Sequence, residues 1–174
     1  LKKNILSLKL KNKHKIIEDN IFKLNNQSDI NKNYDLNGKN AFKGTADKSL
    51  IKNFKNDKFF KKNYPKSLDR EYFKKYFTSL NNLGKYNSIC TASLMTVEGI
   101  LLGLKLLNKK IKIIILTGGG RKNKFIVNKL NKSLKSKKIK IRMIEQFNYN
   151  GDLLEAQAFG YLAVRRLKKL PISL

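Results

Sequence analysis

The fold is decided by one stretch, Ile111-Lys112-Ile113-Ile114-Ile115-Leu116-Thr117-Gly118-Gly119-Gly120. Its first six residues are nearly all apolar and mostly β-branched, which is typical of a strand buried on both faces of a parallel sheet. Three glycines then end the strand. A helical pattern over 121–136 and an alternating pattern over 139–143 follow. Strand, glycine turn, helix and strand form a βαβ unit, so the sequence predicts an α/β fold with a parallel sheet.

The residues before this unit predict helices. The longest pattern covers 87–108, where apolar or small side chains recur at the three- and four-residue spacing of one helical face. These are Ile89, Ser93, Val97, Ile100, Leu104 and Leu107. A short helix is predicted over 46–54 with Thr45 as its N-cap. Another opens near residue 64, and Phe73, Tyr76 and Phe77 give it an aromatic side.

A last helix is predicted after the break Asn150-Gly151-Asp152. Its inner stripe is expected to consist of Ala156, Phe159, Ala163 and Leu167. Asp152 and Glu155 have the spacing of a capping box, in which both carboxylates would bind backbone amides at the helix start. The alternative is that Glu155 faces a ligand.

The glycine turn is the best candidate for a binding site. It lies between a buried strand and the start of a helix, where free amide groups and the helix dipole favour anionic groups. Glycines there allow the backbone to approach a ligand closely. Asn123 adds an amide that would cap the helix or bind a ribose or phosphate. A tight turn without any ligand accounts for the same residues.

Composition gives an ambiguous signal about nucleic acid. The 174 residues contain 39 Lys and Arg against 12 Asp and Glu, a formal charge of +27. Such a charge raises a nucleic-acid-binding hypothesis. However, the lysines alternate with Asn and Ile along the whole chain, and codons rich in A and T specify all three residues. We therefore favour a compositional bias and keep a basic nucleic-acid-binding protein as the alternative.

The remaining signals are mostly negative. Cys90 is alone, so no internal disulfide is expected and a reducing cytoplasm fits,. No apolar run reaches the roughly 18 residues that span a bilayer, so no membrane partner is expected. His14 stands among lysines and favours a solvated surface role,. No Ser/His/Asp or Cys/His set can be assembled.

Several segments, taken in order, resemble the anhydro-N-acetylmuramic acid kinase family of the actin and hexokinase-like ATPase superfamily. Tyr34-Asp35-Leu36-Asn37-Gly38-Lys39 with Gly44 is similar to its Asp-x-x-Gly segment, and the Pro-Lys-Ser block from Pro65 to Phe73 is unusually specific. Thr91-Ala92-Ser93-Leu94-x-Thr96 resembles a helix start of the family. The glycine turn through Asn123, and Glu155-Ala156-x-Ala158-Phe159-x-x-Leu162-Ala163, are similar to its late motifs.

The resemblance implies an ATP-dependent kinase that opens the 1,6-anhydro ring of a recycled cell-wall amino sugar and phosphorylates its O6, with Mg²⁺ on the phosphates. It also implies an actin-like (ribonuclease H-like) α/β domain, the carboxy-terminal half of a two-domain enzyme. In that family Gly118, Gly119, Gly120 and Asn123 would contact the nucleotide, and Glu155 the sugar. A homodimer is one arrangement that the sequence leaves open.

The sequence departs from the family near its amino end. The family's phosphate loop, Gly-Thr-Ser-x-Asp-Gly, and its Asp-Thr-Gly-Pro-Gly-Asn block are not found here. By spacing, the aspartate that serves as the catalytic base would fall near Lys9, and a lysine cannot take that role in the same geometry. We therefore assign no catalytic residue and no metal ligand. We expect a degraded or disordered segment over 1–33, a nucleotide-side domain over 34–174, and an inactive fragment.

Overall fold

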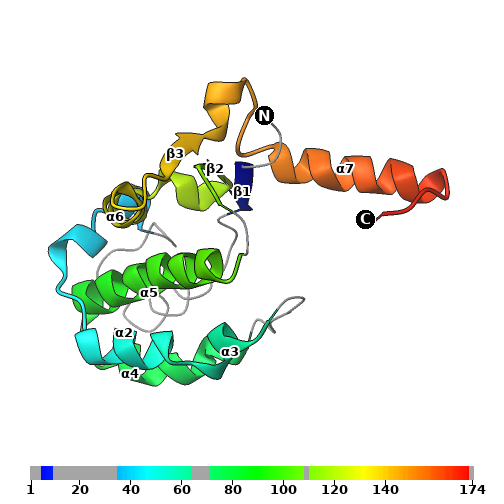
Figure 1. Ribbon diagram of the computed structural model, residues 1–174. Coiled ribbons are helices and arrows are strands. Elements are labelled where there is room, and N and C mark those ends of the chain that lie inside the picture. Colours follow the sequence, from blue (N-terminus) through cyan, green and yellow to red (C-terminus); the bar gives the residue numbers. More distant parts are fainter. Residues whose placement is uncertain (1–4, 10–34, 64–70, 108–109, 173–174) are drawn as a thin grey trace.

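The computed structural model describes residues 5–9, 35–63, 71–107 and 110–172, with the backbone alone described for 5–9. Its sheet is three-stranded and parallel, in the order β1 (Ile5–Lys9), β2 (Ile113–Thr117), β3 (Lys140–Met143). Helices α5 and α6 lie on one side of the sheet, and α7 extends away from the body (Figure 1). The α/β class predicted from the sequence is confirmed.

The βαβ unit forms as predicted. Helix α6 (Lys124–Lys135) connects β2 to β3, and Ile114 and Leu116 are buried against Val127 and Leu134. The helix begins three residues later than the pattern suggested. A 3₁₀ turn over Gly119–Lys122 comes first, and the Asn123 side chain then accepts a hydrogen bond from the Ile126 amide at 3.2 Å, which caps α6,.

Strand β1 was not predicted from its sequence. It lies at the edge of the sheet and pairs in parallel with β2, so that Ile5 lies opposite Ile113 and Lys9 opposite Thr117. An edge strand obtains its hydrogen bonds from a neighbour distant in sequence, and no local pattern reports that neighbour. The rest of the predicted 1–33 segment lies outside the described residues.

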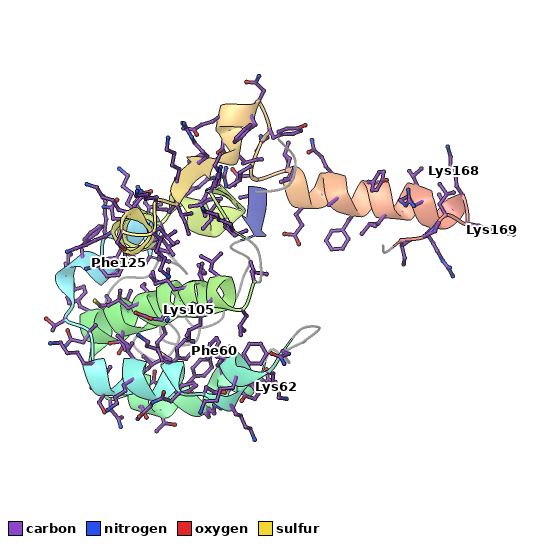
Figure 2. The ribbon with its side chains drawn as sticks, viewed as in Figure 1. Phe60, Lys62, Lys105, Phe125, Lys168 and Lys169 are labelled. Carbon is purple, nitrogen blue, oxygen red and sulfur yellow. The ribbon has the colours of Figure 1, made fainter. Side chains whose placement is uncertain are left out.

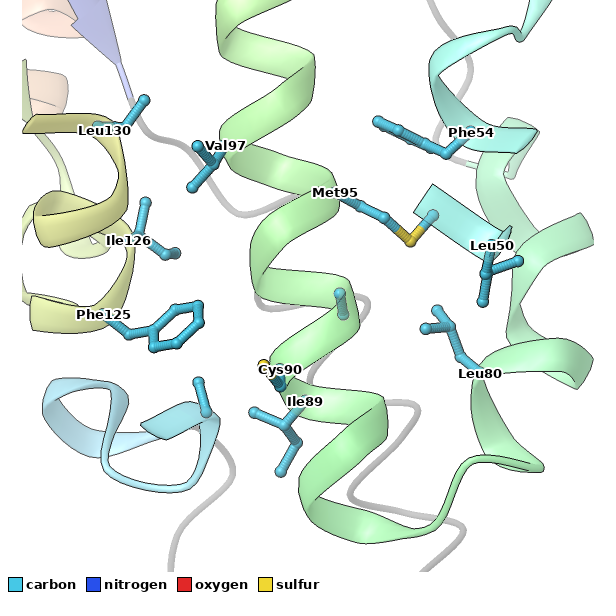
Figure 3. Packing of buried hydrophobic residues seen from close by; sticks show 12 residues of the cluster. Leu50, Phe54, Leu80, Ile89, Cys90, Met95, Val97, Phe125, Ile126 and Leu130 are labelled. Atoms are coloured by element: carbon cyan, nitrogen blue, oxygen red, sulfur yellow. The ribbon is translucent and has the colours of Figure 1, made fainter. Parts of the chain in front are cut away.

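Helix α5 (Lys85–Lys105) is the central core element. Residues 88–93 of this helix are all buried, because helices cover this part from two directions (Figure 3). Val97 and Ile89 face Phe125, Ile126 and Leu130 of α6, whereas Met95 faces the side occupied by Leu50, Phe54 and Leu80. Each fully buried side chain of this size contributes about 2 kcal/mol to folding.

By length and composition alone, α5 would be long and apolar enough to cross a membrane. Half of the most apolar stretch of α5 is buried inside the protein, as expected for a core helix. The prediction that no membrane is involved is not tested by this observation.

The segment before α5 folds into short helices: α2 (Lys48–Lys55), α3 (Lys58–Lys61) and α4 (Phe77–Asn81). The N-cap of α2 is Asp47, which accepts from the Leu50 amide at 2.7 Å, so the assignment of Thr45 was wrong. The predicted opening near residue 64 lies outside the described residues. The described part is a 3₁₀ turn over Tyr72–Tyr76 followed by α4, rather than one continuous helix.

A polar cluster fastens α3 to that turn. The Asp57 carboxylate is almost fully buried and accepts hydrogen bonds from the Tyr72 hydroxyl at 2.6 Å and the Tyr76 hydroxyl at 2.8 Å. Lys75 forms an ion pair with the same carboxylate. The rings of Phe54, Phe60 and Phe73 pack against one another beside it, which agrees with the predicted aromatic side.

Helix α7 (Leu154–Leu167) differs most from expectation. Its predicted inner stripe points into solvent in this chain: Phe159 is 59% exposed and Leu167 83%. The helix leaves the body at the sheet and contributes no buried residue (Figure 1). The prediction of a buried stripe on α7 is therefore wrong, because nothing in the part of the chain that the structure describes covers it.

Candidate functional site

The glycine turn lies at the carboxyl end of β2, the central strand. Gly118 has a φ of 77° and its amide donates to the Gly151 carbonyl at 3.2 Å. Gly119 faces open space, since a Cβ built there would meet no atom within 4 Å. The amides of Gly119 and Gly120 stand in the first turn of a helical segment, where backbone donors have no partner within the helix.

Arg121 organises this end of the sheet. Its side chain is 7% exposed and donates through Nε to Glu145 Oε1 at 2.7 Å and through Nη1 to Asp152 Oδ1 at 2.8 Å. The same Nη1 donates to the Gly118 carbonyl at 2.9 Å. One guanidinium therefore joins the glycine turn to the segment after β3 and to the start of α7.

Asp152 is held in its charged form by this arrangement. Hydrogen bonds from Arg121, and then from Lys122 at 2.6 Å, lower the pKa of Asp152 to about 2. Arg121 likewise lowers the pKa of Glu145. The predicted capping box is wrong, because the carboxylate of Asp152 binds these cations and the N-cap of α7 is Leu153, without a side-chain bond.

Gly151 is a packing requirement of the same cluster. A Cβ at this position would lie 2.5 Å from Arg121 Nε and 2.8 Å from Glu145 Oε1. Only a residue without a side chain allows the guanidinium to lie against the backbone here. The break predicted at residues 150–152 is thus the point where α7 is attached to the glycine turn.

The predicted turn at Asn37-Gly38 meets the other side of the site. Both residues have positive φ, at 57° and 74°, as the Asn-Gly pattern indicated,. A Cβ on Gly38 would lie 2.4 Å from Asn123 Oδ1, so the turn packs directly on the residue that caps α6. Asp35 fixes the turn by accepting from the Asn40 and Ala41 amides.

The structure therefore brings most of the predicted site residues together. Gly118, Gly119, Gly120 and Asn123 lie in one continuous turn. Glu155 is half-buried in the first turn of α7, three residues after the aspartate that pairs with Arg121. The backbone of Lys9 pairs with Thr117, directly before the glycines.

Sequence reasoning missed Arg121 and Glu145, and it named Gly151 only as part of the break before α7. Arg121 directly follows the triple glycine, but its partners come 24 and 31 residues later. A single carboxylate after a strand carries no periodic signal, so only the fold shows the pairing. Within the described ranges, no group of three His, Cys, Asp or Glu side chains could hold a metal ion.

Comparison with known proteins matches this chain to a family. A family model described as anhydro-N-acetylmuramic acid kinase covers residues 19–174. The chain belongs to the anhydro-N-acetylmuramic acid kinase family. The match includes both the glycine turn and α7.

Two curated relatives illustrate the match. An anhydro-N-acetylmuramic acid kinase of Zymomonas mobilis is 37% identical over 140 residues, which are 80% of this chain and 37% of the relative. One of Rhodopseudomonas palustris strain HaA2 is 32% identical over 158 residues, 91% of this chain and 41% of the relative. The chain thus spans about two fifths of the length of these two relatives.

Proposed function

We propose that this chain is the nucleotide-side part of an ATP-dependent anhydro-N-acetylmuramic acid kinase, with residues 34–174 as an actin-like domain. The observation that carries the proposal is the open glycine turn at the end of a buried parallel strand, in a chain that belongs to this family. Clefts at the carboxyl ends of parallel strands are the usual ligand sites of α/β proteins.

Each residue of the turn has a defined task in this proposal. The backbone at Gly118, Gly119 and Gly120 lies against the nucleotide, because no side chain separates it from a ligand. Asn123 holds the turn to α6 and keeps its amide nitrogen beside the site. Arg121 acts on the turn and not on the ligand, since its guanidinium is already engaged by Glu145 and Asp152.

Glu155 is proposed to contact the sugar from the first turn of α7. The substrate would be a 1,6-anhydro amino sugar, from which the kinase makes N-acetylmuramic acid 6-phosphate during cell-wall recycling. A carboxylate accepts hydrogen bonds from sugar hydroxyls, and residues 151–154 connect it to the glycine turn. A cytoplasmic location is part of the proposal, as ATP is the phosphoryl donor.

Mg²⁺ would neutralise charge on the terminal phosphates when ATP is bound. No residue of the described chain is assigned to it, because these residues offer no group of three acidic or metal-binding side chains. The position where the family's base is expected falls near Lys9, whose backbone lies beside Thr117 at the same end of the sheet. A lysine there cannot activate the attacking water as a carboxylate does.

The proposal is tested by calorimetry of ATP binding to this chain and two variants. Gly119→Asp places a negative side chain in the open space at the turn, and we expect nucleotide affinity to fall at least tenfold. Gly119→Ala, the matched control, adds only a methyl group there. Identical affinities in the chain and the Gly119→Asp variant would reject the assigned site.

Phosphorylation is a separate test. Incubation of this chain with the anhydro sugar and MgATP should give no sugar phosphate, because the chain lacks a carboxylate at the expected base position. Turnover by this chain would show that the base is supplied elsewhere in it.

A further inference from the structure

The carboxy-terminal helix carries an apolar stripe that the described residues of the chain leave exposed. Five positions of α7 fall within about a third of the helix circumference at 3.6 residues per turn. They are Ala156, Gly160, Ala163, Val164 and Leu167, and none of them is buried. We call them the α7 stripe. Leu167, the last residue of α7, is 83% exposed.

Two features distinguish the α7 stripe from scattered surface residues. First, apolar side chains at this spacing over three turns form a face that normally packs on another element. Second, Gly160 sits inside the helix, where glycine is less favourable than alanine, although a Cβ there would meet no atom within 4 Å,. Small residues at 156, 160 and 163 would allow a partner backbone to approach closely.

Charge argues against a second copy of this chain as the partner. The chain has a formal charge of +27. Arg165 and Arg166 lie in the last turn of α7, and Lys168 and Lys169 follow that turn (Figure 2). Two copies pairing through α7 would bring these cationic ends into one assembly, which costs electrostatic free energy at moderate salt.

The length of the relatives indicates a different partner. The matched residues make up 37% and 41% of the two kinases, so most of each relative lies outside the match. Helix α7 begins at the ion pair between Arg121 and Asp152, directly beside the glycine turn. A body seated on the α7 stripe would therefore stand next to the candidate nucleotide site.

We propose that the α7 stripe is the docking face for the remainder of an anhydro-N-acetylmuramic acid kinase polypeptide, the part that lies outside this match. This rests on the proposed function, because it assigns the stripe to the boundary between the nucleotide side and the remainder of the same enzyme. Burial of the stripe would hold that remainder over the glycine turn, with Glu155 in the first turn of α7 beside it.

Hydroxyl-radical footprinting without nucleotide tests the proposal on two intact proteins, this chain and the full-length Rhodopseudomonas palustris kinase. In this chain, Val164 and Leu167 should be labelled strongly, and Tyr161 on another face of α7 serves as the internal reference. In the full-length kinase, the peptide matching α7 should be labelled severalfold less. Equal labelling of the two peptides would overturn the proposal, and so would protection of Leu167 in this chain.

Two further measurements test whether the α7 stripe packs against another part of this chain or joins two copies of the chain into a dimer. Leu167→Gln should leave the urea midpoint unchanged, whereas a clear drop would mean that the stripe packs within this chain and would overturn the proposal. Sedimentation should show a monomer. A dimer that Leu167→Gln dissociates would assign the stripe to self-association, which equally contradicts the proposal. None of these results depends on ATP binding, so they can fail while the assigned nucleotide site holds.

Discussion

Arg121 is the residue on which the candidate site depends. It is buried, and it joins the carbonyl of Gly118 to carboxylates that are about half exposed. Replacing it by Met leaves these groups without their cation. We expect Arg121→Met to lower the free energy of unfolding by about 2 kcal/mol, as measured by urea titration.

Arg142 provides the matched control for that variant. It lies exposed on β3, so Arg142→Met should change stability by less than about 0.5 kcal/mol,. Equal effects of the two substitutions would mean that the cluster around Arg121 does not hold the turn.

The charge on Asp152 predicts a dependence of stability on pH. Its pKa in the folded state is about 2, held down chiefly by Arg121, compared with about 3.9 in an unfolded chain. The stabilisation is therefore complete above about pH 4 and is lost as the pH falls toward 2. Because the carboxylate is nearly half exposed, we expect a contribution of only about 1 kcal/mol,.

Asp152→Asn tests this dependence directly. The free energy of unfolding should fall less steeply between pH 4 and 2 in the variant than in the unchanged chain,. Parallel pH profiles from the two proteins would contradict the ion pair.

Two glycines near Arg121 should respond differently to alanine. In Gly151→Ala, the new methyl group would lie 2.5 Å from Arg121 Nε, and we expect a loss of about 2 kcal/mol,. Gly119→Ala enters open space and should cost less than about 0.5 kcal/mol,. Thermal denaturation of both variants would measure the difference, and a reversed order would refute the described geometry.

At the scale of elements, the Asp57 cluster should control how α3 is attached to the core. Asp57→Ala removes the N-cap of α3 and leaves the hydroxyls of Tyr72 and Tyr76 without their acceptor. We expect a loss of about 3 kcal/mol in urea titration. Glu98→Ala breaks only a partly exposed pair with Lys55 and should cost less than about 1 kcal/mol,. Similar costs would show that Asp57 is not a structural anchor.

The elements that could be predicted are those whose pattern is local. The β-branched run before Gly118 and the four-residue spacing in α5 and α6 report burial directly, because neighbouring turns of one element meet the same core. Strand β1 and the ion pairs of Asp152 depend on residues far away in the sequence. The spacing of Asp152 and Glu155 satisfied a local rule, but Arg121 and Lys122 offered stronger partners.

The stripe of α7 shows a related limit. The spacing of its apolar residues predicted a buried face, which the structure contradicts, because spacing cannot show whether any other part of a protein covers that face. The predicted site residues came together because Gly118 to Asn123 are continuous in sequence. Arg121 fixes the geometry of this turn, and it was missed because its partners, Glu145 and Asp152, lie far from it in the sequence.

At the scale of the whole molecule, the charge of +27 does not define a binding surface. Basic residues occur in the last turns of α2, α3, α5, α6 and α7 alike, so they are spread over the molecule (Figure 2). We expect an oligonucleotide to bind only weakly, without sequence preference, and to dissociate as salt rises. Fluorescence anisotropy would measure this. Sequence-specific binding at physiological salt would favour the alternative of a nucleic-acid-binding protein.

Nucleotide binding at the glycine turn can be measured residue by residue in one titration. MgATP is added to the ¹⁵N-labelled chain in physiological salt, which screens exposed lysines, with inorganic triphosphate as the matched control. We predict that ATP shifts the amide signals of Gly118, Gly119 and Gly120, while Gly84 and Gly160 stay unchanged and triphosphate has a much smaller effect. Unchanged signals from the three turn glycines at millimolar ATP would show that the nucleotide does not bind at this turn.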